Sequence, residues 1–303
     1  VAHPQPNWHA ERAEPRLVYQ RRRVMRFVAI GECMVEMAPQ VQAGHYRMGF
    51  AGDTLNTAWY LRQLIDDNKS VDYFTAIGTD VASDRLMTFL IDAGIGTQHI
   101  LRRDDRTLGL YLIQLTMGER SFSYWRGQSA ARTLAVDPAV LAAAIAGADL
   151  VYFSGITLAI LPPSDRINLL KTLAYYRISG GQVAFDSNLR PKLWNTTKVM
   201  KDWVMRAAAV SDIVLPSHDD EALFFGDKDP SATAQRYANI GVSCVVVKDG
   251  LGAVTTLQGG TLAQHAIQAV TKVIDSTAAG DSFNAGFLAV HMDGRPIHEA
   301  IAS

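Results

Sequence analysis

An acidic residue beside a bare turn is the feature of this chain with the clearest chemical meaning. Residues 275–287 read DSTAAGDSFNAGF, and the small side chains of residues 276–280 leave the backbone open. An apolar helical pattern follows, so the N–H groups of Ala278, Ala279 and Gly280 are expected at the positive end of a helix dipole. Such a turn binds anions, and a phosphoryl group in transfer is one that it suits.

Asp281 lies in the first turn of this predicted helix, within reach of anything that the turn binds. A carboxylate next to an anion site is electrostatically unfavourable, and general base catalysis accounts for its presence. The carboxylate could take the proton from a hydroxyl that attacks a phosphoryl group. The alternative is that Asp281 only caps the helix, as aspartate often does. The local pattern leaves both interpretations open.

A second glycine turn precedes a predicted helix near the start of the chain. Residues 49–57 read GFAGDTLNT, and Gly52 allows the backbone to approach a ligand closely. Asp53 and Asn56 follow it, and both could hydrogen-bond the hydroxyl groups of a sugar. Asp53 fits equally well as the N-cap of the helix.

A third cluster, DSNLRP at residues 186–191, comes directly after a predicted buried strand. Ligands of open parallel sheets bind at the carboxyl ends of the strands. Pro191 stops helix formation and holds the loop extended, which places Arg190 toward this cleft. A planar guanidinium is suited to clamp a carboxylate or a phosphate. The alternative is a structural pair between Arg190 and a nearby acid.

Aromatic residues accompany an arginine in two predicted strands within residues 108–125. Tyr111 lies on the first strand, and Tyr124 and Arg126 lie at the end of the second. Because side chains alternate along a strand, Tyr124 and Arg126 share a face. An aromatic ring beside an arginine suits a polar, anionic small molecule, whereas the plainer interpretation is an exposed surface.

The elements that must position these residues alternate between strand and helix. The patterns predict strands at 26–37, 71–77, 150–153, 182–185, 213–215 and 244–248, and helices at 53–65, 80–93, 164–178, 198–210, 219–225 and 232–240. This repetition predicts an α/β fold with a mostly parallel central sheet flanked by helices. Residues 41–51 and 108–125 break the alternation and predict either a small β-sheet over the site or edge strands of the main sheet.

Composition limits the class of protein. The 303 residues are 48% hydrophobic, which allows one large domain with a substantial core. A net charge of -1 without a basic stripe argues against nucleic acid as a partner, and no apolar run approaches the length of a membrane span. Cys33 and Cys244 lie in apolar runs and are predicted to be buried thiols in a reducing compartment, the cytoplasm. Residues 1–24, rich in proline and arginine, are predicted to be a flexible leader before a domain at 25–303.

The motifs resemble those of the ribokinase-like (PfkB) carbohydrate kinases. Residues 275–281 resemble the second signature of that family, D-T-x-[GA]-A-G-D. Residues 51–56 resemble the first, G-G-x-x-x-N, with Ala51 in place of the first glycine. The resemblance favours general base catalysis over capping for Asp281. It implies a ribokinase-like fold with a small β-sheet lid, built from strands at about 39–51 and 107–126, that often mediates a homo-oligomer.

Several phrases are similar to those of 2-keto-3-deoxygluconate kinases within this family, namely GECM at 31–34, GERSFSYWR at 118–126 and SGI at 154–156. The resemblance implies ATP-dependent phosphorylation of that sugar acid, with Asp281 as the base and the amides of 278–281 as the anion hole. Arg126 and Arg190 independently offer cations for its carboxylate. The alternatives are another sugar kinase, such as a fructokinase or a nucleoside kinase, and a non-catalytic sugar-binding sensor.

The nucleotide side of the site is implied by resemblance alone. Residues 245–253, VVVKDGLGA, resemble the family's V-K-x-G-x-x-G-A, which lies against ATP and implies nucleotide contacts at Lys248, Gly250 and Gly252. Neither a P-loop motif nor a dinucleotide-binding G-x-G-x-x-G after the first strand is present, which excludes P-loop kinases and argues against a dehydrogenase.

The family's metal-associated N-x-x-E corresponds here to a segment that begins at Ser217, which is assigned to the nucleotide site. The acid near Mg²⁺ is left open between Asp220 and Glu221. A monovalent cation near Asp275 is a further expectation. The sequence ends at Ser303, inside a helix predicted from Pro296, where the family continues with more helix, so a truncated C-terminal helix is expected.

Overall fold

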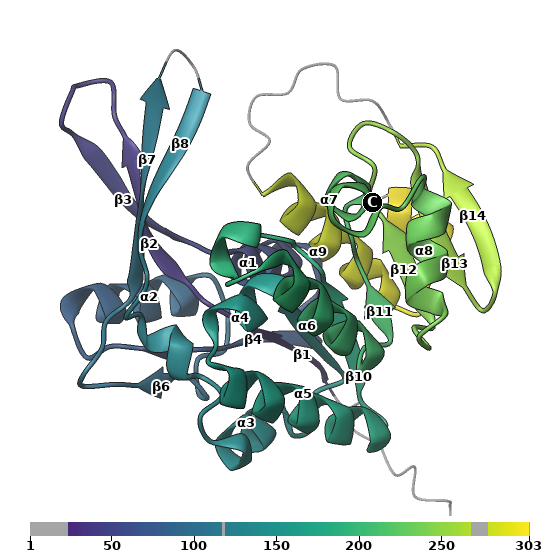
Figure 1. Ribbon diagram of the computed structural model, residues 1–303. Coiled ribbons are helices and arrows are strands. Elements are labelled where there is room, and N and C mark those ends of the chain that lie inside the picture. The colour runs from purple at the N-terminus through teal and green to yellow at the C-terminus, as the bar shows by residue number, and fades with distance from the viewer. Residues whose placement is uncertain (1–23, 117–118, 268–277, 303) are drawn as a thin grey trace, which may run out of the picture.

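The computed structural model of the chain describes residues 24–116, 119–267 and 278–302 (Figure 1). A large sheet forms the centre of the molecule, helices cover both of its faces, and a smaller sheet extends from one end. Apart from Val24, the predicted leader lies outside the described residues, and so does Asp275.

The central sheet has eight strands among the described residues. Six neighbouring strands run parallel, and two antiparallel strands complete one edge. In order across the sheet, they are β14 (Thr261–His265), β13 (Val254–Gln258), β12 (Cys244–Val247), β11 (Ile213–Val214), β10 (Gln182–Asp186), β9 (Leu150–Ser154), β1 (Met25–Ile30) and β4 (Lys69–Phe74). Strands such as β9 and β12 are buried throughout, which is typical of parallel strands covered on both faces.

Alternate residues of the strands pack against helices on opposite faces. In β9, Val151 and Phe153 belong to one apolar core, whereas Leu150 and Tyr152 belong to the other. Helices of the first core are α3 (Pro138–Ile145), α4 (Gly155–Ile160), α5 (Pro163–Ile178), α6 (Thr197–Ala209), α7 (His218–Phe225) and α8 (Pro230–Ala238). Helices of the second are α1 (Asp53–Leu64), α2 (Val81–Asp92), α9 (Ala279–Met292) and α10 (Ile297–Ala302). Within the described ranges, no helix combines the length and the apolar character needed to cross a membrane.

The smaller sheet, which we call the lid, has four strands in the order β3 (Tyr46–Ala51), β2 (Met34–Pro39), β7 (Gly109–Thr116) and β8 (Glu119–Trp125). Its central pair is parallel and its two outer pairs are antiparallel, and β7 and β8 project away from the helices (Figure 1). The prediction of one strand at 26–37 is wrong. The chain leaves the central sheet after β1, turns at residues 31–33 and enters the lid as β2.

The lid joins the body at two glycines that pack against neighbouring atoms. A Cβ on Gly52 would lie 2.2 Å from the carbonyl oxygen of Glu32, and a Cβ on Gly31 would lie 2.1 Å from Oγ1 of Thr54. These contacts exclude a side chain at either position, so the chain entering β2 lies directly against the start of α1. The remaining elements are β5 (Ala76–Ile77), β6 (Leu101–Arg102) and the 3-10 helices η1 (Ala130–Thr133) and η2 (Pro191–Leu193).

Candidate active site

Helix α9 begins at the predicted anion-binding turn. Ala278 is its N-cap residue, with φ of 61° in the left-handed region, and the side chain of Ala278 makes no capping hydrogen bond. A left-handed residue followed by helical ones turns successive N–H groups toward one point, where they can bind an anion. Among the described residues, no side chain is bonded to the N–H groups at this end of α9, so the turn has the form that an anion site needs.

Asp281 lies on the first turn of α9 and contacts helix α1. Its Oδ2 accepts a 2.8 Å hydrogen bond from Nδ2 of Asn56, and its backbone oxygen accepts a 3.2 Å bond from the hydroxyl of Thr57. Helices α1 and α9 lie side by side over the central sheet (Figure 1). The structure thus brings the predicted base together with a predicted sugar-binding residue.

The carboxyl group of Asp281 can exchange a proton near neutral pH. Its pKa is raised from the ordinary value of 3.8 to about 7, chiefly by burial and also by the charges of Asp53 and Asp186. The hydrogen bond from Asn56 and the charge of Lys248 lower it. A carboxylate whose pKa lies near the working pH is an effective general base.

Asp53 lies at the first position of α1 and faces the loop after β10. Nδ2 of Asn188 donates a 2.8 Å hydrogen bond to Oδ2 of Asp53. Burial raises the pKa of Asp53, whereas hydrogen bonds from Ser154 and Asn188 lower it. The alternative role of Asp53 as an N-cap is wrong, because Gly52 occupies that position and no side chain caps the helix.

A buried ion pair lies against the anion-binding turn. Nζ of Lys248 donates 3.0 Å hydrogen bonds to Oδ2 of Asp186 and to Oδ1 of Asn284. Nδ2 of Asn284 donates to the same Asp186 oxygen at 2.6 Å and to the hydroxyl of Tyr152 at 3.1 Å. All four side chains are buried. A Cβ placed on Gly280 would lie 3.8 Å from Nζ of Lys248, so the cationic end of the pair faces the turn.

The residues predicted to contact the nucleotide gather at the end of β12. Ser217 and Lys248 form a parallel bridge between neighbouring chain segments. Gly250 follows with φ of 54°, in the left-handed region that favours glycine, and the N–H of Gly252 donates to the carbonyl of Asp249 at 2.6 Å. Backbone contacts therefore hold Ser217 beside Lys248 and the glycine turn.

The aromatic residues of the lid form one cluster. Tyr111 on β7 lies directly opposite Tyr124 on β8, with ring centroids 5.8 Å apart, and the hydroxyl of Tyr111 donates to Glu36. The guanidinium of Arg126 lies 5.9 Å from the ring centroid of Tyr124. Tyr124 and Arg126 therefore lie close to each other, as the alternation of side chains along a strand predicts.

Arg126 is bound by an acid to which the sequence assigned no role. Its guanidinium donates to Oε2 of Glu32, whose side chain is buried, while the side chain of Arg126 is 11% exposed. Burial raises the pKa of Glu32, whereas Arg126 and Ser129 lower it. Among the described residues, Oε1 of Glu32 and Nε of Arg126 have no hydrogen-bond partner. The arginine predicted to clamp a substrate carboxylate thus already has an anionic neighbour.

The two acids considered for a metal ion lie in different surroundings. Oδ2 of Asp220 lies 3.5 Å from the guanidinium of Arg190, whose side chain is 52% exposed. Glu221 is buried, and its two carboxylate oxygens accept hydrogen bonds from Arg236 at 2.6 Å and from Tyr237 at 2.9 Å. Of the pair, Asp220 is the carboxylate that remains accessible to a cation.

Residues without a predicted role complete the site, namely Glu32, Tyr152, Asp186, Asn188 and Asn284. Two sequence rules could have identified most of them. Glu32, Asp186 and Asn188 lie at or just beyond the ends of parallel strands, where ligands bind. Asn284 lies three residues after Asp281 and therefore on the same face of α9. Tyr152 lies inside a buried strand, and its position carries no comparable indication.

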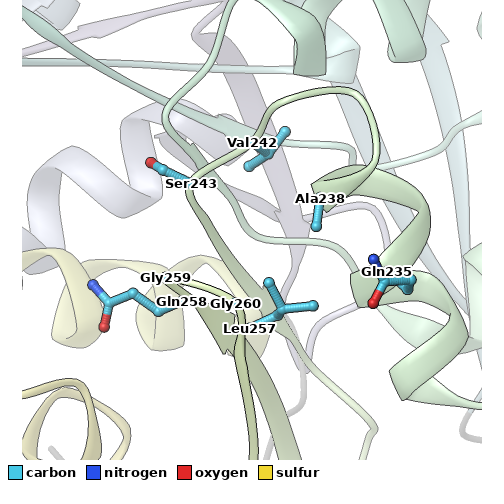
Figure 2. Close-up of a pocket in the computed structure, with 8 residues that line it drawn as sticks. All are labelled: Gln235, Ala238, Val242, Ser243, Leu257, Gln258, Gly259 and Gly260. Atoms are coloured by element: carbon cyan, nitrogen blue, oxygen red, sulfur yellow. The ribbon is translucent and has the colours of Figure 1, made fainter.

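Two surface hollows lie away from these residues. One, of about 490 Å³, lies between α8 and the β13–β14 turn, where Figure 2 shows Gln235 and Ala238 on the helix and Leu257, Gly259 and Gly260 on the strand and its turn. The other, of about 910 Å³, lies between α3 and α5. Neither is lined by a residue predicted for the site, so the side chains described above, rather than these hollows, locate the chemistry.

Comparison with known proteins gives a consistent family. The model of the pfkB family carbohydrate kinases matches residues 25–303. The 2-dehydro-3-deoxygluconokinase of Dickeya dadantii is 39% identical over 280 residues, 89% of either chain. The enzyme of the same name from Haemophilus influenzae is 39% identical over 267 residues, covering 86% of this chain and 84% of its own.

Solved structures agree on the fold. The crystal structure of a PfkB protein from Polaromonas sp. JS666 superimposes with a TM-score of 0.80 at 26% identity, covering 91% of this chain and 92% of its own. An Escherichia coli protein solved in complex with ATP and Mg²⁺ gives a TM-score of 0.77 at 21% identity, covering 91% and 89%.

Proposed function

The chain belongs to the pfkB family of carbohydrate kinases, and from this membership we propose that it phosphorylates 2-keto-3-deoxygluconate, also called 2-dehydro-3-deoxygluconate. ATP supplies the γ-phosphoryl group and the terminal hydroxyl of the sugar acid accepts it. The products are ADP and 2-keto-3-deoxy-6-phosphogluconate. The observation that carries this proposal is Asp281, a carboxylate with a near-neutral pKa on the turn that begins α9.

Asp281 is the general base of this reaction. It takes the proton of the sugar hydroxyl while that oxygen bonds to the γ-phosphorus and the bond from phosphorus to the ADP oxygen breaks. The backbone amides of residues 278–281 hold the negative charge of the group in transfer. Asn56 and Asp53 lie beside the base on α1 and are placed to bind the hydroxyls of the sugar.

The carboxylate of the sugar acid is bound by the two arginines. Arg126 extends from the end of the lid strand β8 and Arg190 follows β10, so they come from different parts of the fold. Tyr111 and Tyr124 add an aromatic surface next to Arg126. A lid over the bound sugar excludes water, which would otherwise compete as an acceptor of the phosphoryl group.

Asp220 would hold Mg²⁺, whose role is to neutralise charge on the phosphates of ATP. The donor set fits, because Mg²⁺ in kinases takes one or two carboxylates and completes its shell with phosphate oxygens and water. The described residues contain no group of three acids, histidines or cysteines arranged for a metal. Glu221 is instead paired with Arg236. A monovalent cation near Asp275 is part of the proposal, although Asp275 lies outside the described residues.

We place the reaction in the cytoplasm, where ATP is abundant and thiols stay reduced, and Cys33 and Cys244 are free and buried. We also propose that two copies associate through the lid. Phe122, Tyr124 and Trp125 are exposed on β8, and a cluster of exposed aromatic side chains is typical of a contact surface.

One observation favours a competing function, phosphorylation of a neutral ketose such as fructose. The charge of Arg126 is balanced by Glu32, so its attraction for a substrate carboxylate is reduced. A non-catalytic sugar-binding sensor is less well supported, because a sensor has no need of a base at Asp281.

A kinetic comparison of substrates tests the proposal. ADP release is measured with ATP and Mg²⁺ on 2-keto-3-deoxygluconate, fructose and ribose. We expect kcat/KM for the sugar acid to exceed that for fructose at least about 100-fold, as for sites built to pair a polar group. Asp281→Asn should lower kcat by about 10²–10⁴ and retain ATP binding in equilibrium titration. Comparable kcat/KM on fructose would identify a fructokinase, and sugar binding without turnover of any substrate would identify a sensor.

A further inference from the structure

The buried ion pair behind the anion-binding turn carries an inference that deepens the proposed function and rests on it. We propose that Lys248 is a positioning residue for phosphoryl transfer. Held by Asp186 and Asn284, it directs its positive charge at the Gly280 turn and strengthens that turn as the seat of the transferred phosphoryl group.

The ion pair has a direction relative to the turn. Nζ of Lys248 lies 3.8 Å from the position that a Cβ on Gly280 would take. If the residues next to Gly280 and the backbone of α9 are left aside, no other atom of the described residues lies within 4 Å of that position. The carboxylate of Asp186 is therefore farther away. A pair whose positive end is the nearer one attracts an anion at the turn, and its field adds to that of the α9 dipole.

Lys248 is fixed at both ends. Its Nζ contacts two acceptors at 3.0 Å, and its own N–H and carbonyl bond to Pro216 and His218 at 2.9 and 2.7 Å. One of the two Nζ acceptors, Asn284, lies on α9 itself, one turn beyond Asp281. The helix that binds the anion thus also holds the cation in place, and no side chain has to reorganise when the phosphoryl group arrives.

The burial of Lys248 argues for this positioning role and against direct binding of the nucleotide by its side chain. The side chain of Lys248 is buried, and two of its three donors are used by Asp186 and Asn284. In such surroundings solvent and salt screen its charge much less than on the surface. A purely structural ion pair would be another explanation, since buried pairs can often be replaced by neutral side chains without loss of stability. Activity and stability must therefore be measured separately.

Two variants separate the possibilities. Lys248→Met removes the cation and leaves Asp186 buried without it. Lys248→Met/Asp186→Asn removes both charges and keeps a neutral, similarly shaped pair. Lys248 lowers the pKa of Asp281 and Asp186 raises it. The single variant should therefore move the acidic limb of the pH–kcat profile to higher pH, and the double variant should return it toward the wild-type position. Asp53 and Asn56, which also face Asp281, are unchanged in both.

If Lys248 has this positioning role, Lys248→Met should lower kcat, and the double variant should not restore it. We expect kcat at saturating ATP and sugar acid, on the plateau above the acidic limb, to fall by roughly 10- to 100-fold in both variants. KM for the sugar acid should change less than about threefold, because Lys248 acts on the group in transfer rather than on the ground state. Binding of ADP with aluminium fluoride, a mimic of the transferred group, should weaken by a similar factor while binding of ADP alone does not.

A matched control is present on the surface. Lys198 and Asp202 form a Lys–Asp pair of 2.6 Å on α6 with both side chains exposed, and Lys198→Met/Asp202→Asn should leave all these quantities unchanged. If the buried double variant recovers wild-type kcat together with its melting temperature, or if the folded single variant keeps wild-type kcat, the inference is wrong. If the single variant does not fold, the double variant decides. If the wild type does not phosphorylate 2-keto-3-deoxygluconate, the proposed substrate is refuted instead. The ratio of variant to wild-type kcat is then measured on the sugar that the wild type does phosphorylate.

Discussion

Asn56 and Asp281 lie 225 positions apart in the chain, and a 2.8 Å hydrogen bond joins Nδ2 of the first to Oδ2 of the second. One residue lies on α1 and the other on α9, so this bond exists only when the two helices pack together. Because the bond favours the charged form of Asp281, it lowers the pKa that burial raises. Packing of the fold and reactivity of the base thus depend on the same contact.

Removal of this hydrogen bond should change the pH dependence of the reaction. Asp281 must be deprotonated to act as a base, so wild-type kcat should rise with pH through about 7 and then level off. Asn56→Ala raises the pKa of Asp281, and the rise should move to higher pH. The measurement is kcat at saturating substrates across the neutral range. Asn239→Ala removes an exposed hydrogen bond at the C-terminal end of α8; this variant is the control and should leave the profile in place.

Asp281→Asn should stabilise the ligand-free protein at alkaline pH. The folded state raises the pKa of Asp281 from 3.8 to about 7, so its contribution to stability is complete below the lower value and is lost as the pH rises through the upper one. Asparagine carries no charge and avoids this loss. We expect the variant to melt about 2–6 °C above the wild type at pH 8, with the difference narrowing at pH 5. A difference that is equal at both pH values would contradict the raised pKa.

Replacement of Arg126 and of Arg190 should have different effects on thermal stability but similar effects on recognition of the sugar acid. Arg190→Ala removes an exposed side chain and should cost little stability, whereas Arg126→Ala leaves Glu32 buried without its cation and should lower the melting temperature. Both should lower kcat/KM for the sugar acid by roughly one to two decades, Arg190→Ala by more. Glu32→Gln/Arg126→Ala should recover the melting temperature but not kcat/KM. An equal loss on fructose would show that neither arginine reads the carboxylate.

Asp220 and Glu221 should respond differently to neutralisation. Asp220→Asn should raise the Mg²⁺ concentration needed for half-maximal activity by about 10-fold and leave the melting temperature nearly unchanged. Glu221→Gln removes the buried charge that binds Arg236 and should lower the melting temperature by roughly 2–6 °C with an unchanged Mg²⁺ requirement. Magnesium titration and thermal unfolding of both variants make the comparison. The opposite pattern would assign the metal to Glu221.

The parallel sheet could be predicted from the sequence because its strands are apolar runs that alternate with helical patterns. The division between β1 and β2 could not, because strand-forming residues continue across Gly31 and the change of sheet depends on contacts with α1. The hairpin of β13 and β14 was not predicted, since its threonines and glutamines weaken the apolar pattern. Its Gly259–Gly260 turn is a hairpin pattern that could have indicated it.

The location of the site could be predicted from the sequence, but the pairs that its charged side chains form could not. Turns at strand ends and helix starts converge in any sheet of this type, which is why Asp53, Asn56 and Asp281 meet. No local rule tells which acid pairs with which base across long separations. Arg126 and Glu32 are 94 positions apart, and the pairing of Lys248 with Asp186 spans 62. These partners are selected by three-dimensional packing.

The contact at Gly31 and Gly52 also sets the mechanics of the lid. The two connections of the lid that lead to β1 and α1 meet at this contact, where the carbonyl of Glu32 lies against Gly52 and the side chain of Thr54 lies against Gly31. A displacement of the chain at Glu32, just before β2, therefore acts directly on Gly52, the residue that precedes Asp53. A single methyl group at either glycine would act as a wedge at this contact. It would shift the start of β2 relative to the start of α1 while leaving every sugar-binding side chain intact.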